Sequence, residues 1–424
     1  MSARLVVKDF SCIVSAEIDI SSLTVLIGPS ASGKSILSKL IFFFNDLLND
    51  QWQTIEEGKG LDNFKTLVKE KFKEWFPVEA WGEGKFQIEF YAGDYQVRIS
   101  RIEYRKKLGD NMRVWLSPYF EEQYAVALSA FKEAARLSEG RMMDSREVRA
   151  SYELRERLRK INRKRLGDNH VDIQTFIPAG RSFFTSIGKS IVAFEHGRIL
   201  DPLILRFGRF YAGVRDRRYA PPQARVTTLL STRLDSLMSG ALVFERNKEY
   251  LRTPDGRKVP LSAMSSGQQE LMPLVLALKN RATLLEHGDF QQMLFVEEPE
   301  AHLFPSSQSA LVELFSHFLA HSKGRARMIL TTHSPYVLAK INNLIKAREV
   351  AGSRKGTRKA ALIQEIIKEE YWFDGAKLRA YAIKDGTVCR IQDMDDNLIE
   401  AEYLDEVSGA IASEFSRILG VEFS

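Results

Sequence analysis

The sequence lacks the features on which membrane, disulfide-rich and zinc-binding proteins depend. Its two cysteines, Cys12 and Cys389, lie near opposite ends of the chain, and neither belongs to a CxxC pair or has metal-ligand spacing. We therefore expect no disulfide framework and no zinc site, and we predict that both cysteines are small buried hydrophobic residues. The longest apolar runs fall far short of the roughly 20 residues that a membrane-spanning helix needs. Because the N-terminus has no signal-peptide hydrophobic segment, we expect a cytoplasmic protein without membrane contacts.

The chain instead has the composition of a large globular protein. Its 424 residues, 44% of them hydrophobic, are enough to bury a substantial core. The formal net charge is +6, and the charge is unevenly distributed. Residues 141–165 hold ten Lys or Arg and four Asp or Glu, an excess equal to that of the whole chain. This segment either faces nucleic acid or an acidic protein partner, or forms a solvated helix face.

The order of strand and helix patterns predicts an α/β protein. Residues 4–10 and 16–20 are typical of strands, and residues 23–28 form a fully apolar strand that we expect at the centre of a sheet. A helix is predicted over residues 36–48. Further strand and helix patterns continue towards the C-terminus, where a last helix is expected from about Leu404.

Residues 119–168 break this alternation of strands and helices. Two narrow apolar stripes with helical spacing indicate an antiparallel helical hairpin, a short coiled-coil-like arm inserted into the fold. Two ordinary surface helices on the main core are the alternative. The arm separates an N-terminal lobe, residues 1–118, from a C-terminal lobe, residues 169–424. The stripes consist of Tyr124, Leu128, Phe131 and Ala135 in one helix and of Leu154, Leu158 and Ile161 in the other.

The segment that follows the apolar strand matches the phosphate-loop pattern G-x-x-x-x-G-K-[ST] and opens a predicted helix. Glycines let the backbone approach phosphates closely, and successive N–H groups form a nest for anionic oxygens. Lys34 is expected to reach the β- and γ-phosphates, and the Ser35 hydroxyl is expected to coordinate Mg²⁺. The candidate contact residues are Gly28, Ser30, Ser32, Gly33, Lys34 and Ser35.

Two carboxylates, Glu297 and Glu298, directly follow an apolar segment that is typical of a buried strand. Neighbouring side chains of a strand point to opposite faces, so these two can share a task only if the strand ends there and the chain turns. Pro299 provides that end. In a nucleotide site, the first acid would hold the hydrated Mg²⁺, and the second would orient and deprotonate the attacking water.

A third apolar strand ends at His333, which stands before Pro335 and a predicted helix. A helix-capping or core histidine is one interpretation. The ends of parallel strands, however, open onto the ligand crevice of α/β sheets, where an imidazole can contact a γ-phosphate.

A second Ser/Gly-rich turn, residues 262–270, also runs into an apolar helical pattern. Unpaired backbone amides and the helix dipole make such a loop-to-helix start a natural anion site. One nucleotide needs a single phosphate loop, so the turn itself leaves open whose phosphate it would hold.

In this order, the motifs resemble a known family. A phosphate loop, a later Ser-Ser-Gly-Gln-Gln turn, a strand ending in Glu-Glu and a strand ending in Thr-His-Ser are similar to those of ABC-type ATPase heads, the superfamily of SMC, RecF and RecN proteins. The stretches VEEPEAHLFP, FIPAGRS and YAIKDG resemble the OLD-like branch, which includes ATPase subunits of bacterial anti-phage modules such as AriA of the PARIS system. The resemblance covers most of the chain except the arm. It implies a mixed sheet flanked by helices, with ATP and Mg²⁺ as ligands.

The resemblance also implies a role for each matching residue. Lys34 and Ser35 correspond to the phosphate and Mg²⁺ residues, Glu297 to the metal-side acid and Glu298 to the catalytic base. His333 corresponds to the switch histidine. The signature turn, which in the family closes over ATP bound to the opposite subunit, corresponds to Ser265, Ser266, Gly267 and Gln268.

The sequence departs from the family pattern at two positions. Ser30 replaces a frequent Asn in the phosphate loop, and Glu297 stands where many relatives have Asp, but both changes preserve the required chemistry. For the glutamine contact loop of the family, Gln174 is the first candidate and Arg181 the second. The chain has no Toprim-type acidic nuclease domain after the ATPase motifs, so we expect that cutting of nucleic acid needs a partner.

These features favour an ATP-hydrolysing regulatory subunit of an anti-phage defence module. It would form a homo-oligomer, a dimer or higher, and hold an effector protein such as a nuclease or toxin. The alternative is a DNA-binding SMC/RecF-type repair ATPase that places residues 141–165 and the SRKGTRK segment, residues 353–359, on DNA or on a DNA-mimic protein. A transporter ATPase is disfavoured because such heads are usually shorter and lack an arm. A P-loop kinase is disfavoured by the second turn and the switch histidine.

Overall fold

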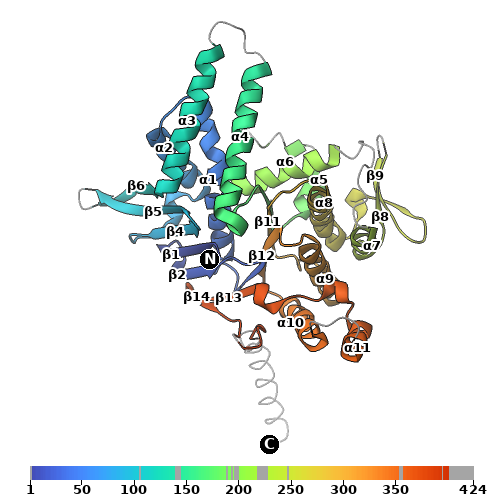
Figure 1. Cartoon of the computed structure of the whole chain (residues 1–424). Coiled ribbons are helices and arrows are strands. Elements are labelled where there is room, and N and C mark those ends of the chain that lie inside the picture. Colours follow the sequence, from blue (N-terminus) through green and yellow to red (C-terminus); the bar gives the residue numbers. More distant parts are fainter. Residues whose placement is uncertain are drawn as a thin grey trace, which may run out of the picture.

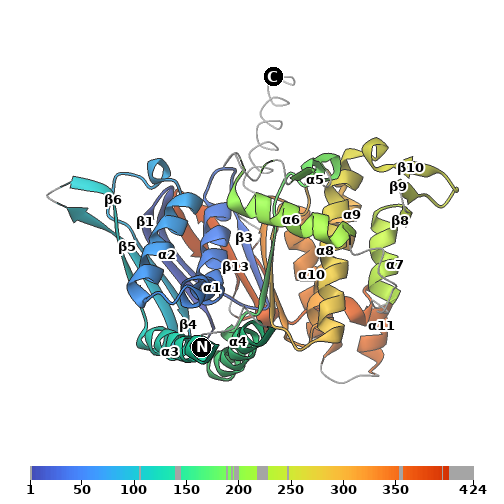
Figure 2. The ribbon, with the colours of Figure 1, turned by 90° about the horizontal axis from the view of Figure 1, so that it is seen from above.

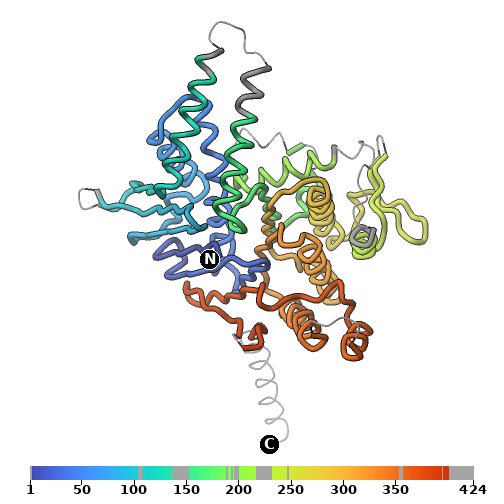
Figure 3. The backbone as a smooth tube through the Cα atoms, in the orientation of Figure 1, coloured from blue at the N-terminus to red at the C-terminus, as the bar shows by residue number. Residues whose placement is uncertain are grey.

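The computed structural model describes most of the chain (Figure 3). The helix predicted from Leu404 lies outside the described residues, as do residues 141–144 of the basic stretch and residues 353–356 of the SRKGTRK segment. Within the described part, none of the helices combines the length and the apolar character that crossing a membrane requires. The described residues are 2–104, 107–138, 145–187, 190–191, 194, 200–216, 228–245, 248–352, 357–393 and 395–400.

Within these residues, eleven strands form one mixed sheet in the order β6-β5-β4-β1-β2-β14-β13-β3-β12-β11-β7. Its strands are β1 Arg4–Phe10, β2 Ile13–Asp19, β3 Leu23–Ile27, β4 Gln87–Ala92, β5 Tyr95–Tyr104, β6 Lys107–Leu116, β7 Ile173–Ile177, β11 Gln292–Glu297, β12 Ala326–Thr332, β13 Leu378–Lys384 and β14 Thr387–Arg390. A separate three-stranded sheet has the order β10-β9-β8. Its strands are β8 Ala241–Glu245, β9 Lys248–Arg252 and β10 Lys258–Pro260.

The strands that carry the predicted site residues are parallel neighbours. β13, β3, β12, β11 and β7 lie side by side, and their register places Ile27 beside Thr332 and Thr331 beside Glu297. The carboxyl ends of these strands therefore meet at one edge of the sheet, which is where parallel α/β folds place their ligand sites.

Helices cover both faces of the sheet (Figure 2). In β11, Met293 and Phe295 pack in the core shared with α1, α2 and α3, whereas Leu294 and Val296 pack in the core shared with α8, α9 and α10. Glu297, the next residue, therefore points to the same side as Phe295, towards α1. The helices are α1 Lys34–Glu56, α2 Leu61–Trp75, α3 Pro118–Ser138, α4 Ser145–Leu166, α5 Ser182–Ile187, α6 Pro202–Asp216, α7 Thr228–Leu237, α8 Ser266–His287, α9 Pro305–His321, α10 Pro335–Ala351 and α11 Arg358–Ile366.

α3 and α4 form an antiparallel pair that projects from the sheet (Figure 1). Tyr124 and Leu158 of the predicted stripes are buried, but Ile161 is 44% exposed, so its place in the stripe was predicted wrongly. The base of α3 also packs on the head, the name used for the two lobes of residues 1–118 and 169–424, because the Tyr124 hydroxyl donates to Thr54 Oγ1 of α1 at 2.8 Å. The apolar stripe of α3 therefore packs against both α4 and the head. The side chain of Ala135 lies outside the described part.

Three further features differ from the sequence-based expectations. Cys12 and Cys389 are exposed rather than buried, because Cys12 lies in the tight turn between β1 and β2 and Cys389 lies on an exposed face of β14. Strand β6 was not predicted, since Gly109, Asp110 and Asn111 in its first half are turn-forming residues. Helices α5, α6 and α7, which follow β7, were not predicted either.

Candidate functional site

The phosphate loop takes a shape that only glycine permits at two positions. Gly33 has a left-handed φ of 103°, and a Cβ on this residue would collide with the Ile13 side chain. A Cβ on Gly28 would lie 2.9 Å from the carbonyl oxygen of Ile383 on β13. The loop backbone is thus pressed against neighbouring strands, while Ser30 at its tip is exposed.

Lys34 is the first residue of α1 and is buried. Its Nζ donates to the carbonyl oxygens of Gly28 and Pro29, both at 2.8 Å. Burial lowers the pKa of Lys34, and the nearby charges of Glu298, Glu300 and Glu297 act in the opposite direction. The ammonium group therefore lies within electrostatic reach of all three carboxylates.

Beside this lysine, the loop contains one buried side-chain oxygen without a partner. The buried Oγ of Ser32 accepts and donates no hydrogen bond within the described residues. Ser35, in the first turn of α1, is exposed. A buried hydroxyl without a partner is costly unless a ligand satisfies it, which is consistent with a polar ligand at this loop.

Glu297 is the last residue of β11 and is buried on the α1 side of the sheet. Burial raises the pKa of the Glu297 carboxyl, and polar contacts with the Ser35 hydroxyl and the Ala179 backbone N–H partly offset this effect. Its Oε2 accepts the Ala179 N–H at 3.5 Å. A buried carboxylate next to a hydroxyl provides the kind of oxygen ligands that Mg²⁺ prefers.

Glu298 has a left-handed φ of 41°, which is uncommon for a residue with a side chain. Its N–H donates to the carbonyl oxygen of Thr331 at 3.0 Å. The turn after β11 begins here, and the Glu298 carboxylate reaches His333, with Oε1 3.2 Å from Nε2. The structure thus brings both predicted acids and the predicted histidine to one edge.

A third carboxylate, Glu300, belongs to the same site and was not predicted. Its Oε1 accepts from the Thr332 hydroxyl at 2.7 Å and from the His333 N–H at 2.6 Å. Its Oε2 is buried and has no hydrogen-bond partner within the described residues. The available signal was the third acid of the EEPE sequence, which directly follows Pro299. Glu300 fixes the backbone that carries His333.

The signature residues lie at the start of α8. Ser265 caps the helix in a capping box, in which its Oγ accepts the Gln268 N–H and its own N–H donates to Gln268 Oε1. A Cβ on Gly267 would lie 2.8 Å from the carbonyl oxygen of His302, so this glycine permits close contact with the loop after β11. Ser266 is exposed. Within the described part, no hydrogen bond or ion pair joins the turn to the phosphate loop of the same chain.

Neither candidate for the glutamine contact loop presents its side chain to the phosphate loop. Gln174 lies near the amino end of β7, opposite Met293, and its Nε2 donates to the carbonyl oxygen of Phe42. At about 3.3 Å per residue, it lies roughly 13 Å along the sheet from the carboxyl ends. Arg181 does follow β7 at the correct edge, but its side chain is fully buried.

The basic stretch of the arm is tied to the head. Four of its arginines form ion pairs with head carboxylates, which balances their charge locally. The pairs are Arg155 with Glu56, Arg159 with Asp172, Arg163 with Asp289 and Arg165 with Asp94. Fewer of the ten basic residues in this stretch therefore remain available to an external phosphate backbone.

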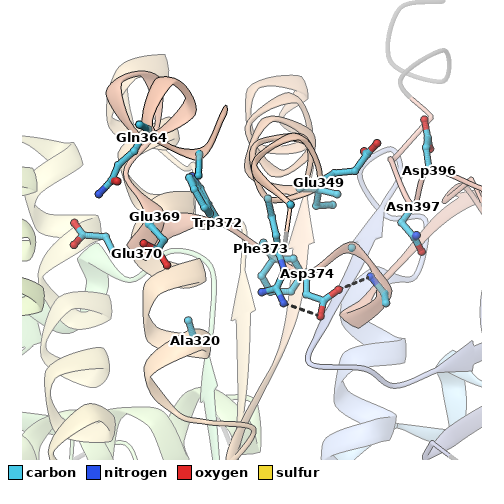
Figure 4. Close-up of a pocket in the computed structure, with 17 residues that line it drawn as sticks. Ala320, Glu349, Gln364, Glu369, Glu370, Trp372, Phe373, Asp374, Asp396 and Asn397 are labelled. Atoms are coloured by element: carbon cyan, nitrogen blue, oxygen red, sulfur yellow. Dashed lines mark hydrogen bonds and ion pairs between the residues drawn. The ribbon is translucent and has the colours of Figure 1, made fainter. Parts of the chain in front are cut away.

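A cavity of about 720 Å³ lies elsewhere, at the far ends of α9 and α10 (Figure 4). Acidic residues including Glu349, Glu370 and Asp374 surround it, together with Trp372. Gly352, another lining residue, lies 19 positions beyond His333, at the opposite end of α10. None of the predicted site residues lines this cavity.

A buried strand, a glycine loop and a helix that begins with a lysine beside carboxylates define the class of P-loop ATPase folds. The family model described as "AAA domain, putative AbiEii toxin, Type IV TA system" matches residues 23–339, and the chain belongs to this family. The match spans the phosphate loop, the signature turn, both acids and His333. Among curated proteins, no sequence matches this chain significantly.

Three similar solved structures are SMC head domains. The SMC head domain from Thermotoga maritima has 14% identity and a TM-score of 0.37, over 92% of this chain and 98% of that chain. An SMC head bound to the C-winged helix domain of ScpA has 13% identity and a TM-score of 0.42, over 93% of this chain and 98% of that chain. The SMC head with an extended coiled coil bound to the C-terminal domain of ScpA, from Pyrococcus furiosus, has 13% identity and a TM-score of 0.39, over 96% and 98%.

Proposed function

We propose that this chain binds ATP with Mg²⁺ and hydrolyses it at the carboxyl edge of the parallel strands. The observation that carries the proposal is the position of Lys34 within reach of Glu297, Glu298 and Glu300. Lysine and loop N–H groups suit the phosphates, and carboxylates suit a metal ion and a water molecule. These are the groups that phosphoryl transfer to water requires.

The donor atoms at this edge fit Mg²⁺. Ser35 and Glu297 would hold the ion, since Mg²⁺ prefers carboxylate and hydroxyl oxygens. Glu300 Oε2 and Ser32 Oγ, both buried without partners, are further oxygens that a charged ligand can satisfy. When bound, the ion neutralises charge on the phosphate oxygens.

In this proposal, hydrolysis uses a base and a group that contacts the terminal phosphate. Glu298 is the base in this proposal because its carboxylate is partly exposed at the edge and can accept a proton from water. His333 is the phosphate sensor, and its contact with Glu298 links the two groups. Glu300 holds the His333 N–H and thereby orients the sensor.

The signature turn supports assembly as a homo-oligomer, a dimer or higher. Its capping box leaves Ser265 and Ser266 exposed at a helix N-terminus, where an anion is favoured. We assign this anion to the γ-phosphate of ATP bound to a second subunit, so each site is completed by two chains.

At the level of biology, we propose a regulatory subunit of a bacterial anti-phage module of the kind that includes AriA of PARIS. It would control an effector such as a nuclease or toxin. The words "putative AbiEii toxin" and "Type IV TA system" in the family description support this assignment. The ion pairs of Arg155, Arg159, Arg163 and Arg165 with the head favour it over a DNA-binding repair ATPase.

The first experiment measures phosphate release by the purified chain with ATP, in the presence and absence of Mg²⁺. We expect Mg²⁺-dependent hydrolysis that Lys34→Ala abolishes, and a wild-type chain without such activity would contradict the ATPase proposal.

In the second experiment, the chain is expressed together with its neighbouring genes during phage challenge. Protection that requires both the chain and an adjacent nuclease or toxin gene supports the module. Salt-sensitive retention of DNA by the chain alone would instead support the repair ATPase.

A further inference from the structure

Arg181 is fully buried where three segments of the chain meet. Its Nη1 donates to the carbonyl oxygen of Glu297 at 2.6 Å, and its Nη2 donates to that of Glu298 at 3.1 Å. Its Nε donates to the carbonyl oxygen of Glu270 at 3.1 Å. One planar guanidinium thus bridges the acidic end of β11 and the second turn of α8.

Glu270 completes this bridge from the side of α8. Its side chain is buried, with Oε2 3.4 Å from Arg181 Nε. The same carboxylate accepts the backbone N–H of Arg181 at 2.9 Å and that of Ser182 at 3.0 Å. Glu270 lies in the helix that Ser265 caps, so the signature turn and this bridge belong to one rigid element.

The bridge acts on a strained residue. The left-handed backbone of Glu298 is costly for a residue with a side chain and persists only where its surroundings hold it. The N–H of Glu298 is held by Thr331, and its carbonyl oxygen is held by Arg181. Loss of the second bond would free the peptide that aims the Glu298 carboxylate at His333.

We propose that Arg181 is a positioning residue that couples the first turns of α8 to the orientation of Glu298. This inference rests on the proposed ATPase function and adds its regulation. Engagement of the signature turn by a second subunit shifts α8, Glu270 moves with the helix, and Arg181 transmits the shift to the backbone of Glu298. The base of one site is thereby set by the occupancy of the other.

The test is a double-mutant cycle on ATP hydrolysis by the full chain. Arg181→Lys keeps a positive charge, but its single ammonium nitrogen cannot span the separate carbonyl oxygens that the three guanidinium nitrogens reach. We therefore expect kcat to fall about 10- to 100-fold, as for misplaced catalytic groups. The ATP dissociation constant should stay near the wild-type value. In the Glu298→Gln background, Arg181→Lys should lower the residual rate no further, because its effect passes through the carboxylate.

Glu270→Gln is the second variant and keeps the shape of the bridge while removing its charge. We expect a smaller fall in kcat that is not additive with that of Arg181→Lys. Arg101→Lys is the matched control, since Arg101 is a buried arginine that donates to the carbonyl oxygens of Gly82 and Gly109 in the antiparallel half of the sheet. It should leave kcat per bound nucleotide unchanged.

Three results would overturn the inference while leaving the ATPase proposal intact. These are a normal kcat for both Arg181→Lys and Glu270→Gln, an equal fall in the Glu298→Gln background, or an equal fall for Arg101→Lys. Each hydrolysis rate is divided by the fraction of chains that bind ATP, so partial unfolding of a variant is not mistaken for a fall in kcat. A wild-type chain without hydrolysis refutes the proposed function itself.

Discussion

Replacement of the proposed base is the sharpest test of the site. Glu298→Gln keeps the size of the side chain and both backbone bonds of the residue, to Thr331 and Arg181. It removes the negative charge and, with it, the capacity to accept a proton. Because the side chain is 41% exposed, the loss of its contact with His333 should alter stability little, by about 0–1 kcal/mol.

The expected loss of activity is much larger than the change in stability. A positioned general base contributes roughly 10²–10⁴-fold to a rate. At about 1.36 kcal/mol per factor of ten, this corresponds to about 2.7–5.4 kcal/mol in the activation barrier. Glu298→Gln should therefore keep ATP bound, hydrolyse it slowly and accumulate the closed assembly.

The assay measures phosphate release at saturating ATP and Mg²⁺, together with ATP binding by the same preparation. Glu313→Gln is the control, because Glu313 is a partly buried glutamate on α9 that pairs with Lys340 at 2.6 Å, away from the phosphate loop. Hydrolysis by Glu298→Gln at the wild-type rate would refute the assignment of the base. Loss of ATP binding would show that Glu298 holds the nucleotide rather than activating water.

Four further outcomes are expected. Lys34→Ala should weaken ATP binding about 10- to 100-fold, which corresponds to the loss of one or two charge-assisted hydrogen bonds. A titration with a fluorescent nucleotide measures this affinity, and an unchanged value would exclude Lys34 from phosphate binding. Ser265→Arg should leave ATP binding intact but abolish hydrolysis and ATP-dependent assembly in light scattering, and normal turnover would reduce the turn to a helix cap. Burial raises the pKa of Glu297 above its unfolded value of 4.5, so ionisation destabilises the ligand-free native state as pH rises through the folded pKa. Glu297→Gln, which cannot ionise, should therefore unfold at a higher temperature than the wild type at neutral pH and have the same stability at acidic pH, and the opposite order would be incompatible with a raised pKa. Glu300→Ala leaves the Thr332 hydroxyl and the His333 N–H without an acceptor. The free energy of unfolding, measured with urea, should therefore fall by about 1–3 kcal/mol. An unchanged midpoint of urea unfolding would contradict the observed bonds.

The sequence by itself determined the elements that depend on local pattern. The phosphate loop, residues 28–35, is a continuous segment whose glycines, lysine and flanking strand are neighbours in the chain. The same holds for the strand that ends at Glu297 and the strand that ends at His333. Parallel strands with apolar patterns bring their carboxyl ends to one edge, so three separate stretches were enough to predict that these candidate residues lie together.

Only the tertiary structure decided how side chains from distant segments meet. Arg181 is buried among carbonyl groups because Glu270, 89 residues later in the chain, packs against it. Gln174 points to the same side of the sheet as Glu297 but lies away from the site, because the register of β7 with β11 places it towards the opposite end of the strands. Glu300 joins the site because the turn after β11 folds back onto Thr332. Burial and hydrogen bonding of this kind depend on neighbours that no local pattern contains, whereas strand, loop and helix starts are set by the adjacent residues.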